Sequence, residues 1–208
     1  SYFSEFHFYH VDFIVFIAHF IPFIFLSIFF FKQFKYLKVF SLSDTVYFLL
    51  IATFGGVIGT LSMVKALQLS EFSKYSVVIL LQKLQPVFAI FLAAILLKEK
   101  PSKKFYLVAV VAIISSYFLA FGIQKPTLLE KNNIKACIFS LIAAFSFGSG
   151  TVFGRKVLHK YDFITSTFYR FGFTTLILFF ILLINKNIFL FKDFFANRSM
   201  THLALFIA

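Results

Sequence analysis

The chain has 208 residues, of which 61% are hydrophobic and only 13% are charged, and its mean hydropathy is +0.93. A soluble domain of this length could not bury so much apolar surface, so a lipid bilayer must solvate part of it. The net charge of +12 does not indicate nucleic-acid binding, because Lys and Arg lie in short gaps between apolar segments and form no single basic face.

Apolar windows of helical length predict an all-α polytopic membrane protein. We expect about six full spans and part of a seventh, at residues 12–31, 45–68, 73–97, 104–123, 134–154, 163–184 and from 200 onwards. The loops after the first, third and fifth spans carry more Lys and Arg than the others, so the positive-inside rule places them in the cytoplasm. The expected location is the plasma or inner membrane. The expected partners are the lipid bilayer and a small-molecule substrate.

The third span contains a polar cluster, Gln82-Lys83-x-Gln85-Pro86. A charge near the bilayer centre costs at least about 2.5–3.5 kcal/mol, so such a side chain usually faces a bundle interior or a water-filled path. Pro86 has no N–H and tends to kink the helix beside this charge. Gln82 and Gln85 share one helix face, and Ser76 shares the face of Lys83. We expect these five residues to bind substrate. The alternative is that Lys83 pairs with a neighbouring helix and serves packing alone.

Small residues form faces on the second and fifth spans, where they allow helices to approach closely. We expect packing, with a possible share in gating, at six glycines: Gly55, Gly56, Gly59, Gly148, Gly150 and Gly154. Ser146 and Ser149 are candidate substrate contacts, although each could instead hydrogen-bond back to its own helix. Arg170, about two turns into the sixth span, is expected to have a structural or gating role.

The sequence also contains an internal repeat. The tripeptide Asp-Phe-Ile occurs at residues 12–14 and again at residues 162–164, and residues 40–52 resemble residues 197–208 in the same order. The repeat unit is then about five helices, and an odd number makes the two copies cross the membrane in opposite directions. We expect an internal fragment of a protein with about ten helices, divided into a first repeat at 1–123, a loop at 124–133 and a second repeat at 134–208.

The order of several short motifs resembles the EamA branch of the drug/metabolite transporter superfamily. These motifs are Ala66-Leu67, LQPVFA at 84–89, LLKEK at 96–100, SLIAAFSFG at 140–148, Arg155-Lys156 and Tyr169-Arg170. The resemblance implies a bundle of two inverted five-helix repeats around a central cavity, and the export or import of small metabolites. Lys83 departs from the family pattern, in which this position is more often apolar or small.

The function predicted from these observations is transmembrane transport, in the direction of export, of small polar metabolites such as amino acids by alternating access. Two alternatives stay open. One is an intramembrane enzyme or lipid-handling protein with Lys83 in its site, and the other is a non-transporting membrane subunit whose polar cluster docks a partner helix. The sequence has no metal-ligand spacing, phosphate loop or nucleophile elbow. We therefore expect no catalytic residue, no metal site and no cofactor, and the sequence indicates no particular oligomeric state.

Overall fold

The protein is described by a computed structural model that covers residues 10–70, 75–98, 100, 102–121 and 131–187. These residues form helices and connecting turns, with no strand among them, which confirms the predicted all-α fold class. Five helices are long and apolar enough to cross a membrane: Val11–Phe29, Leu42–Leu69, Val78–Leu96, Ile134–Leu158 and Phe163–Ile184.

Each of these five helices coincides with a predicted span. The predicted span at 104–123 corresponds to helix α7 (Lys103–Phe121), whose apolar stretch Lys104–Ser115 is shorter than the other five. The predicted span from residue 200 onwards lies outside the described residues. The inverted repeat and its boundaries stay predictions.

The chain divides into two compact units. The first unit comprises Ser1–Val57 and Phe153–Ala208, and the second unit comprises Ile58–Val152. The boundaries fall within two of the long helices, namely Leu42–Leu69 and α8 (Lys131–Leu158).

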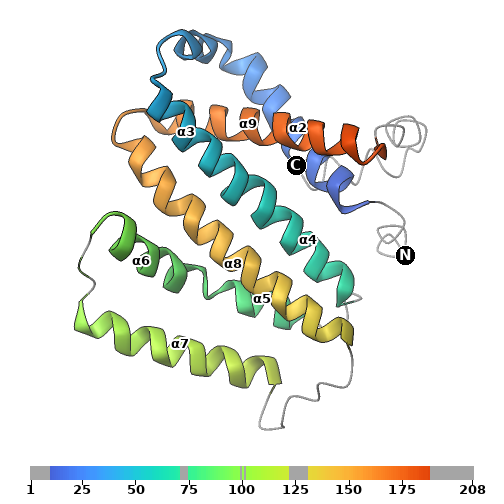
Figure 1. Cartoon of the computed structure of the whole chain (residues 1–208), viewed down its shortest axis with the longest axis vertical. Helices are drawn as coiled ribbons and strands as arrows, with labels where there is room; N and C mark the ends of the chain where they lie inside the picture. The colour runs from blue at the N-terminus through green and yellow to red at the C-terminus, as the bar shows by residue number, and fades with distance from the viewer. Residues whose placement is uncertain (1–9, 71–74, 99, 101, 122–130, 188–208) are drawn as a thin grey trace. The chain divides into compact units, whose positions relative to one another are not determined.

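In the first unit, α2 (Val11–Phe29) lies beside α9 (Phe163–Ile184), as Figure 1 shows. The two helices are antiparallel, because Asp12 at the start of α2 accepts a hydrogen bond from Asn185 just after the end of α9. A 3-10 helix, η2 (Phe31–Lys38), follows α2. One buried cluster of this unit consists of Phe48, Ile51, Val157, Phe168 and Tyr169.

Two helices of the first unit begin at side-chain caps. Helix α3 (Leu42–Leu50) starts with a capping box, in which the Ser41 hydroxyl accepts from the Asp44 N–H and the Asp44 carboxylate accepts from the Ser41 N–H. Asp162 caps α9 by accepting from the Thr165 N–H. The α3 helix continues into a π-helical segment, η3 (Ile51–Ile58), a conformation that is rare and often found at functional sites.

The second unit contains α4 (Gly59–Leu69), α5 (Tyr75–Gln82), α6 (Gln85–Leu96), α7 and most of α8. Ala66 of α4, Val78 of α5 and Ala136 of α8 are buried against one another. Helices α5 and α6 form one apolar span that is interrupted at Lys83 and Leu84. The predicted kink is therefore a hydrogen-bonded turn, with Pro86 in the first turn of α6, where a missing N–H costs nothing.

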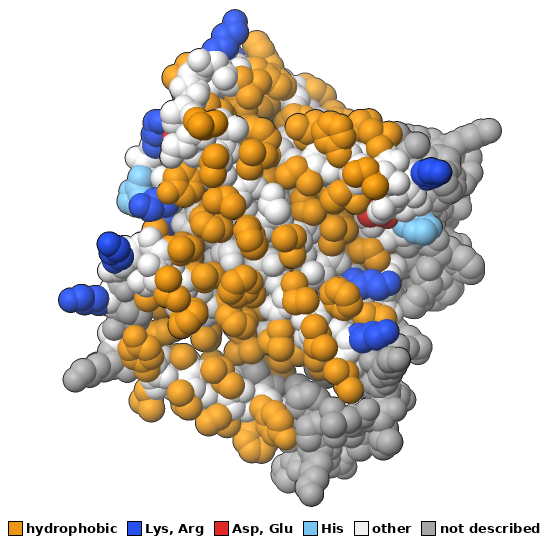
Figure 2. Space-filling view, viewed as in Figure 1, with side chains coloured by type: hydrophobic (Ala, Val, Ile, Leu, Met, Phe, Trp, Pro, Cys, Tyr) orange, Lys and Arg blue, Asp and Glu red, His pale blue; other side chains and the backbone are white. Residues whose placement is uncertain are grey.

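Large apolar side chains are exposed on both units. Phe29 of the first unit is 73% exposed and Leu107 of the second unit is 70% exposed. Figure 2 shows hydrophobic side chains over most of the visible surface, with few charged side chains among them. Exposed apolar area on this scale is typical of helices that lipid solvates.

Candidate functional site

The interruption between α5 and α6 frees backbone groups beside the predicted polar cluster. The N–H groups of Lys83 and Leu84 each donate to a carbonyl three residues earlier, and the N–H groups of Val87 and Phe88 both donate to the Leu84 carbonyl. Pro86 has no N–H to donate to the Gln82 carbonyl. This carbonyl thus receives no helical hydrogen bond from Pro86.

The side chains of the cluster differ in burial. Lys83 and Pro86 are exposed, whereas Gln82 and Gln85 are half-buried. The Gln82 side-chain nitrogen is fully buried and has no hydrogen-bond partner among the described residues. A buried amide without a partner is costly, so this nitrogen is a candidate contact for a solute oxygen. The side chain of Ser76 lies outside the described part of the chain.

Helix α8 approaches this cluster at Gly148. A Cβ atom on Gly148 would lie 3.0 Å from the Ala89 backbone nitrogen and 3.1 Å from the Gln85 carbonyl oxygen of α6. The two helices also meet through Phe88 and Phe145, whose ring centroids are 5.8 Å apart. The structure therefore brings Gln85 and Gly148 together.

The remaining predicted positions on α8 are buried small residues. Ser146, Ser149 and Gly150 are buried, and the Ser149 hydroxyl donates to the Phe145 carbonyl of its own helix at 2.8 Å. Gly154 differs from them, because a Cβ atom there would have no neighbour within 4 Å.

Gly55 and Gly56 are buried in the π-helical segment of the first unit, and Gly59 is buried at the start of α4 in the second. A Cβ atom on Gly56 would overlap the Thr174 side chain of α9, so a larger residue there would force this side chain to shift. Arg170 is exposed on α9, with its guanidinium carbon 5.9 Å from the centre of the Phe171 ring.

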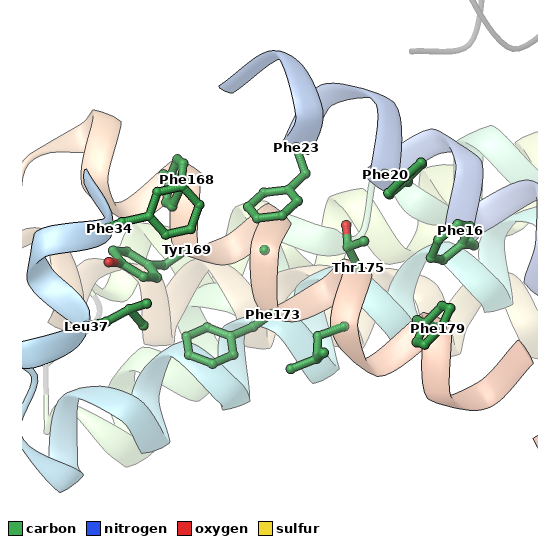
Figure 3. Close-up of a pocket in the computed structure, with 12 residues that line it drawn as sticks. Phe16, Phe20, Phe23, Phe34, Leu37, Phe168, Tyr169, Phe173, Thr175 and Phe179 are labelled. Carbon is green, nitrogen blue, oxygen red and sulfur yellow. The ribbon is translucent and has the colours of Figure 1, made fainter. Parts of the chain in front are cut away.

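The first unit also contains an apolar cavity of about 320 Å³ that sequence reasoning did not find. It lies between α2 and α9 next to η2 (Figure 3). Most of the side chains that line it are aromatic: Phe16, Phe20, Phe23, Phe34, Leu37, Phe168, Tyr169, Gly172, Phe173, Thr175, Leu176 and Phe179. The sequence does not distinguish the Phe residues that line the cavity, because Phe supplies 36 of the 208 residues.

A charged cluster joins α3 to the turn between α8 and α9. One oxygen of Asp44 accepts from Lys160 at 2.5 Å and from Tyr161 at 2.7 Å, in addition to the Ser41 N–H. The hydrogen bond that Lys160 donates to Asp44 raises the pKa of the Lys160 ammonium. Burial, and secondly the hydrogen bond to Asp44, raise the pKa of Tyr161. Both shifts favour the protonated forms, which donate to the carboxylate.

Polar contacts also join the end of α9 to the start of α2 and the start of α9 to η2, which follows α2. At one end, the side-chain amides of Asn185 and Asn187 donate to Asp12 at 2.8 and 2.9 Å. At the other end, the Thr165 hydroxyl donates to the Gln33 side chain and the Tyr169 hydroxyl donates to the Gln33 carbonyl, both at 2.7 Å. Within the described residues, no group of three or more His, Cys, Asp and Glu side chains could hold a metal ion.

Comparison with known proteins decides the family. The sequence matches the EamA-like transporter family over residues 3–121 and 134–208. The chain belongs to the EamA-like transporter family. This confirms the family expected from the motif order, and together with the five apolar helices it identifies a multi-pass membrane protein of a transporter family.

One curated EamA-type relative is similar over most of this chain. "Riboflavin transporter ImpX" of Fusobacterium nucleatum subsp. nucleatum is 44% identical over 172 residues, which cover 82% of this chain and 58% of that protein. The chain thus spans little more than half the length of this relative. No solved structure matches the present chain.

Proposed function

We propose that this protein transports riboflavin, or a closely related flavin, across the cell membrane. The observation that carries the proposal is the 44% identity, over 82% of the chain, to a relative whose name states riboflavin transport. The EamA-like family match over both halves of the sequence supports a transporter in preference to an intramembrane enzyme or a non-transporting subunit.

The proposed mechanism is alternating access between two inverted repeats. The repeated Asp-Phe-Ile tripeptide at the starts of α2 and α9, and the antiparallel packing of these helices, support it. The interrupted α5–α6 span supports it as well, because transporters often place freed carbonyls of broken helices at the solute site. In this scheme Gln82 and Gln85 donate and accept hydrogen bonds, the Gln82 carbonyl accepts one, and Gly148 allows close helix approach beside them.

A flavin suits this cluster chemically. Its sugar-alcohol chain carries several hydroxyl groups that both donate and accept, so the side-chain amides of Gln82 and Gln85 can pair with them. The sequence favoured amino acids and export, with Lys83 attracting a negative group. Amino acids therefore belong in the test panel, and flux in both directions must be followed.

The test is counterflow in liposomes that contain the complete protein. Vesicles preloaded with unlabelled riboflavin are diluted into labelled riboflavin, and transient accumulation of the label is measured against protein-free vesicles. We expect accumulation with riboflavin and none with amino acids. Counterflow of an amino acid without counterflow of riboflavin would replace the flavin proposal, and a protein that moves no member of the panel would contradict transport itself.

A further inference from the structure

We propose that the cavity between α2 and α9 is a binding site for the flat ring system of a flavin. This inference rests on the proposed function and adds a place in the first unit that binds the ring, separate from the Gln82–Gln85 cluster of the second unit. All the residues that line the cavity belong to the first unit.

The first argument is the aromatic character of the walls. Phe16 and Phe20 of α2 stack with ring centroids 5.1 Å apart, and Phe34 of η2 meets Phe168 of α9 edge to face at 5.0 Å. Aromatic rings bind another flat ring through offset stacking and edge contacts, beyond the gain from burying apolar area. A volume of about 320 Å³ is at the lower end of the range for small-molecule sites and suits a fused ring system.

The second argument is an unsatisfied hydroxyl in the wall. Thr175 lines the cavity, is only 7% exposed, and its hydroxyl oxygen is buried without a hydrogen-bond partner among the described residues. In Figure 3 this hydroxyl points toward the α2 side of the cavity, where Phe20 and Phe23 lie.

Some other hydroxyls in the apolar helices have partners, whereas the buried hydroxyl oxygens of Ser27 and Ser166, like that of Thr175, have none among the described residues. The Ser140 and Ser149 hydroxyls donate to carbonyls four residues earlier, and the Thr174 hydroxyl lies 3.5 Å from the Ala52 carbonyl. Of these three unpartnered hydroxyls, only that of Thr175 belongs to a residue that lines the cavity. A buried hydroxyl without a partner is costly, and a carbonyl or ring nitrogen on the edge of a flavin would accept from it.

The same two observations favour a flavin ring over a lipid chain. An acyl chain would bind equally well to a wall of aliphatic side chains, and it would leave the Thr175 hydroxyl without a partner. A flat ring with a polar edge uses both features of this wall. Gly172 keeps the wall in place, because a Cβ atom there would lie 2.9 Å from the Phe23 ring and would push it aside.

The test measures riboflavin binding to the complete purified protein through quenching of the intrinsic fluorescence of riboflavin, which stacking on aromatic rings reduces. Phe20→Leu and Phe23→Leu keep the wall apolar but remove one ring each, so we expect each to weaken binding about two- to tenfold. Thr175→Val keeps the shape of the side chain and removes the hydroxyl, with a similar expected loss of about two- to tenfold. Thr175→Ser keeps the hydroxyl, so this variant should bind riboflavin about as well as the wild type does.

The matched control is Phe180→Leu, because Phe180 is 55% exposed on α9 next to Phe179 and does not line the cavity. It should bind riboflavin as the wild type does. If a ring variant fails to fold, the Thr175→Val and Thr175→Ser pair still decides the question. A wild-type protein that does not bind riboflavin would overturn the proposed function. Binding that survives unchanged in the Leu and Val variants would overturn this site alone, and would favour a lipid chain as its occupant.

Discussion

Lys160 donates a hydrogen bond to Asp44 across a sequence separation of 116 residues, and Tyr161 donates to the same carboxylate oxygen. Asp44 also belongs to the capping box that starts α3. One carboxylate therefore fixes both the beginning of a membrane helix and the turn between two others.

We expect Asp44→Asn to lower the temperature of thermal unfolding more than Lys160→Met does. The aspartate change weakens three hydrogen bonds, with Ser41, Lys160 and Tyr161, whereas the lysine change removes only one of these three. Unfolding can be followed in detergent by intrinsic tyrosine fluorescence. Lys156→Met removes a charge from an exposed position on α8 and serves as the control. Equal effects of Asp44→Asn and Lys160→Met would contradict the shared role of the carboxylate.

The stabilisation by Lys160 should depend on pH at the alkaline end. Its pKa in the folded protein is raised above the ordinary value of 10.5, mainly by the hydrogen bond to Asp44. A raised pKa gives stability that is fully present below the ordinary pKa and is lost as pH rises through the folded pKa. The pKa of Tyr161 is raised above 10.0, which acts with the same sign.

The measurement is the unfolding temperature of wild type and Lys160→Met between about pH 7 and about pH 11. We expect a constant difference up to about pH 10, followed by a decrease. A difference that already disappears near neutral pH would rule out the charged lysine as its source.

Two glycines on different helices should respond oppositely to alanine. Gly56→Ala places a methyl group on the Thr174 hydroxyl, so we expect a loss of about 1–3 kcal/mol in the free energy of unfolding. Gly154→Ala meets open space inside a helix and should be neutral or stabilising by up to about 1 kcal/mol. Thr174→Ala should recover part of the loss in the Gly56→Ala background. Chemical denaturation measures all four proteins, and a tolerated Gly56→Ala would contradict the close packing.

Gln82→Met should separate stability from transport. The change removes a buried amide nitrogen that has no partner among the described residues, so stability should stay equal or increase by about 1 kcal/mol. Riboflavin counterflow should decrease, because the proposed solute contact is lost. Ile79→Met on the exposed surface of α5 is the matched control. Unchanged counterflow in Gln82→Met would remove this side chain from the solute path.

Lys83→Ala tests the charge at the interruption of the span. If Lys83 attracts a negative group, counterflow of a phosphorylated flavin or another anion should decrease more than counterflow of neutral riboflavin, while expression stays intact. Unaltered flux of every anion tested would leave Lys83 without a role in transport.

The spans and the interruption at Lys83 could be predicted because each depends on local chemistry. A run of apolar residues is sufficient for a membrane helix. The missing N–H of Pro86 favours a kink, although Pro22 lies inside the uninterrupted helix α2. Tertiary contacts behave differently. The Asp44–Lys160 pair joins residues distant in sequence, and the Phe-lined cavity depends on how α2 and α9 face each other. Likewise, the glycine pattern treats Gly148 and Gly154 alike, although only Gly148 has a close neighbour in the structure.

The contacts at both ends of the α2–α9 pair limit how these helices can move. If α9 slid along α2 by one helical turn, about 5.4 Å, it would lose its hydrogen bonds to Asp12 and to Gln33 together. A rotation of both helices together would break neither. We therefore expect α2 and α9 to move as one rigid pair. Spectroscopic probes on the two ends of this pair should report one constant separation throughout the proposed transport cycle.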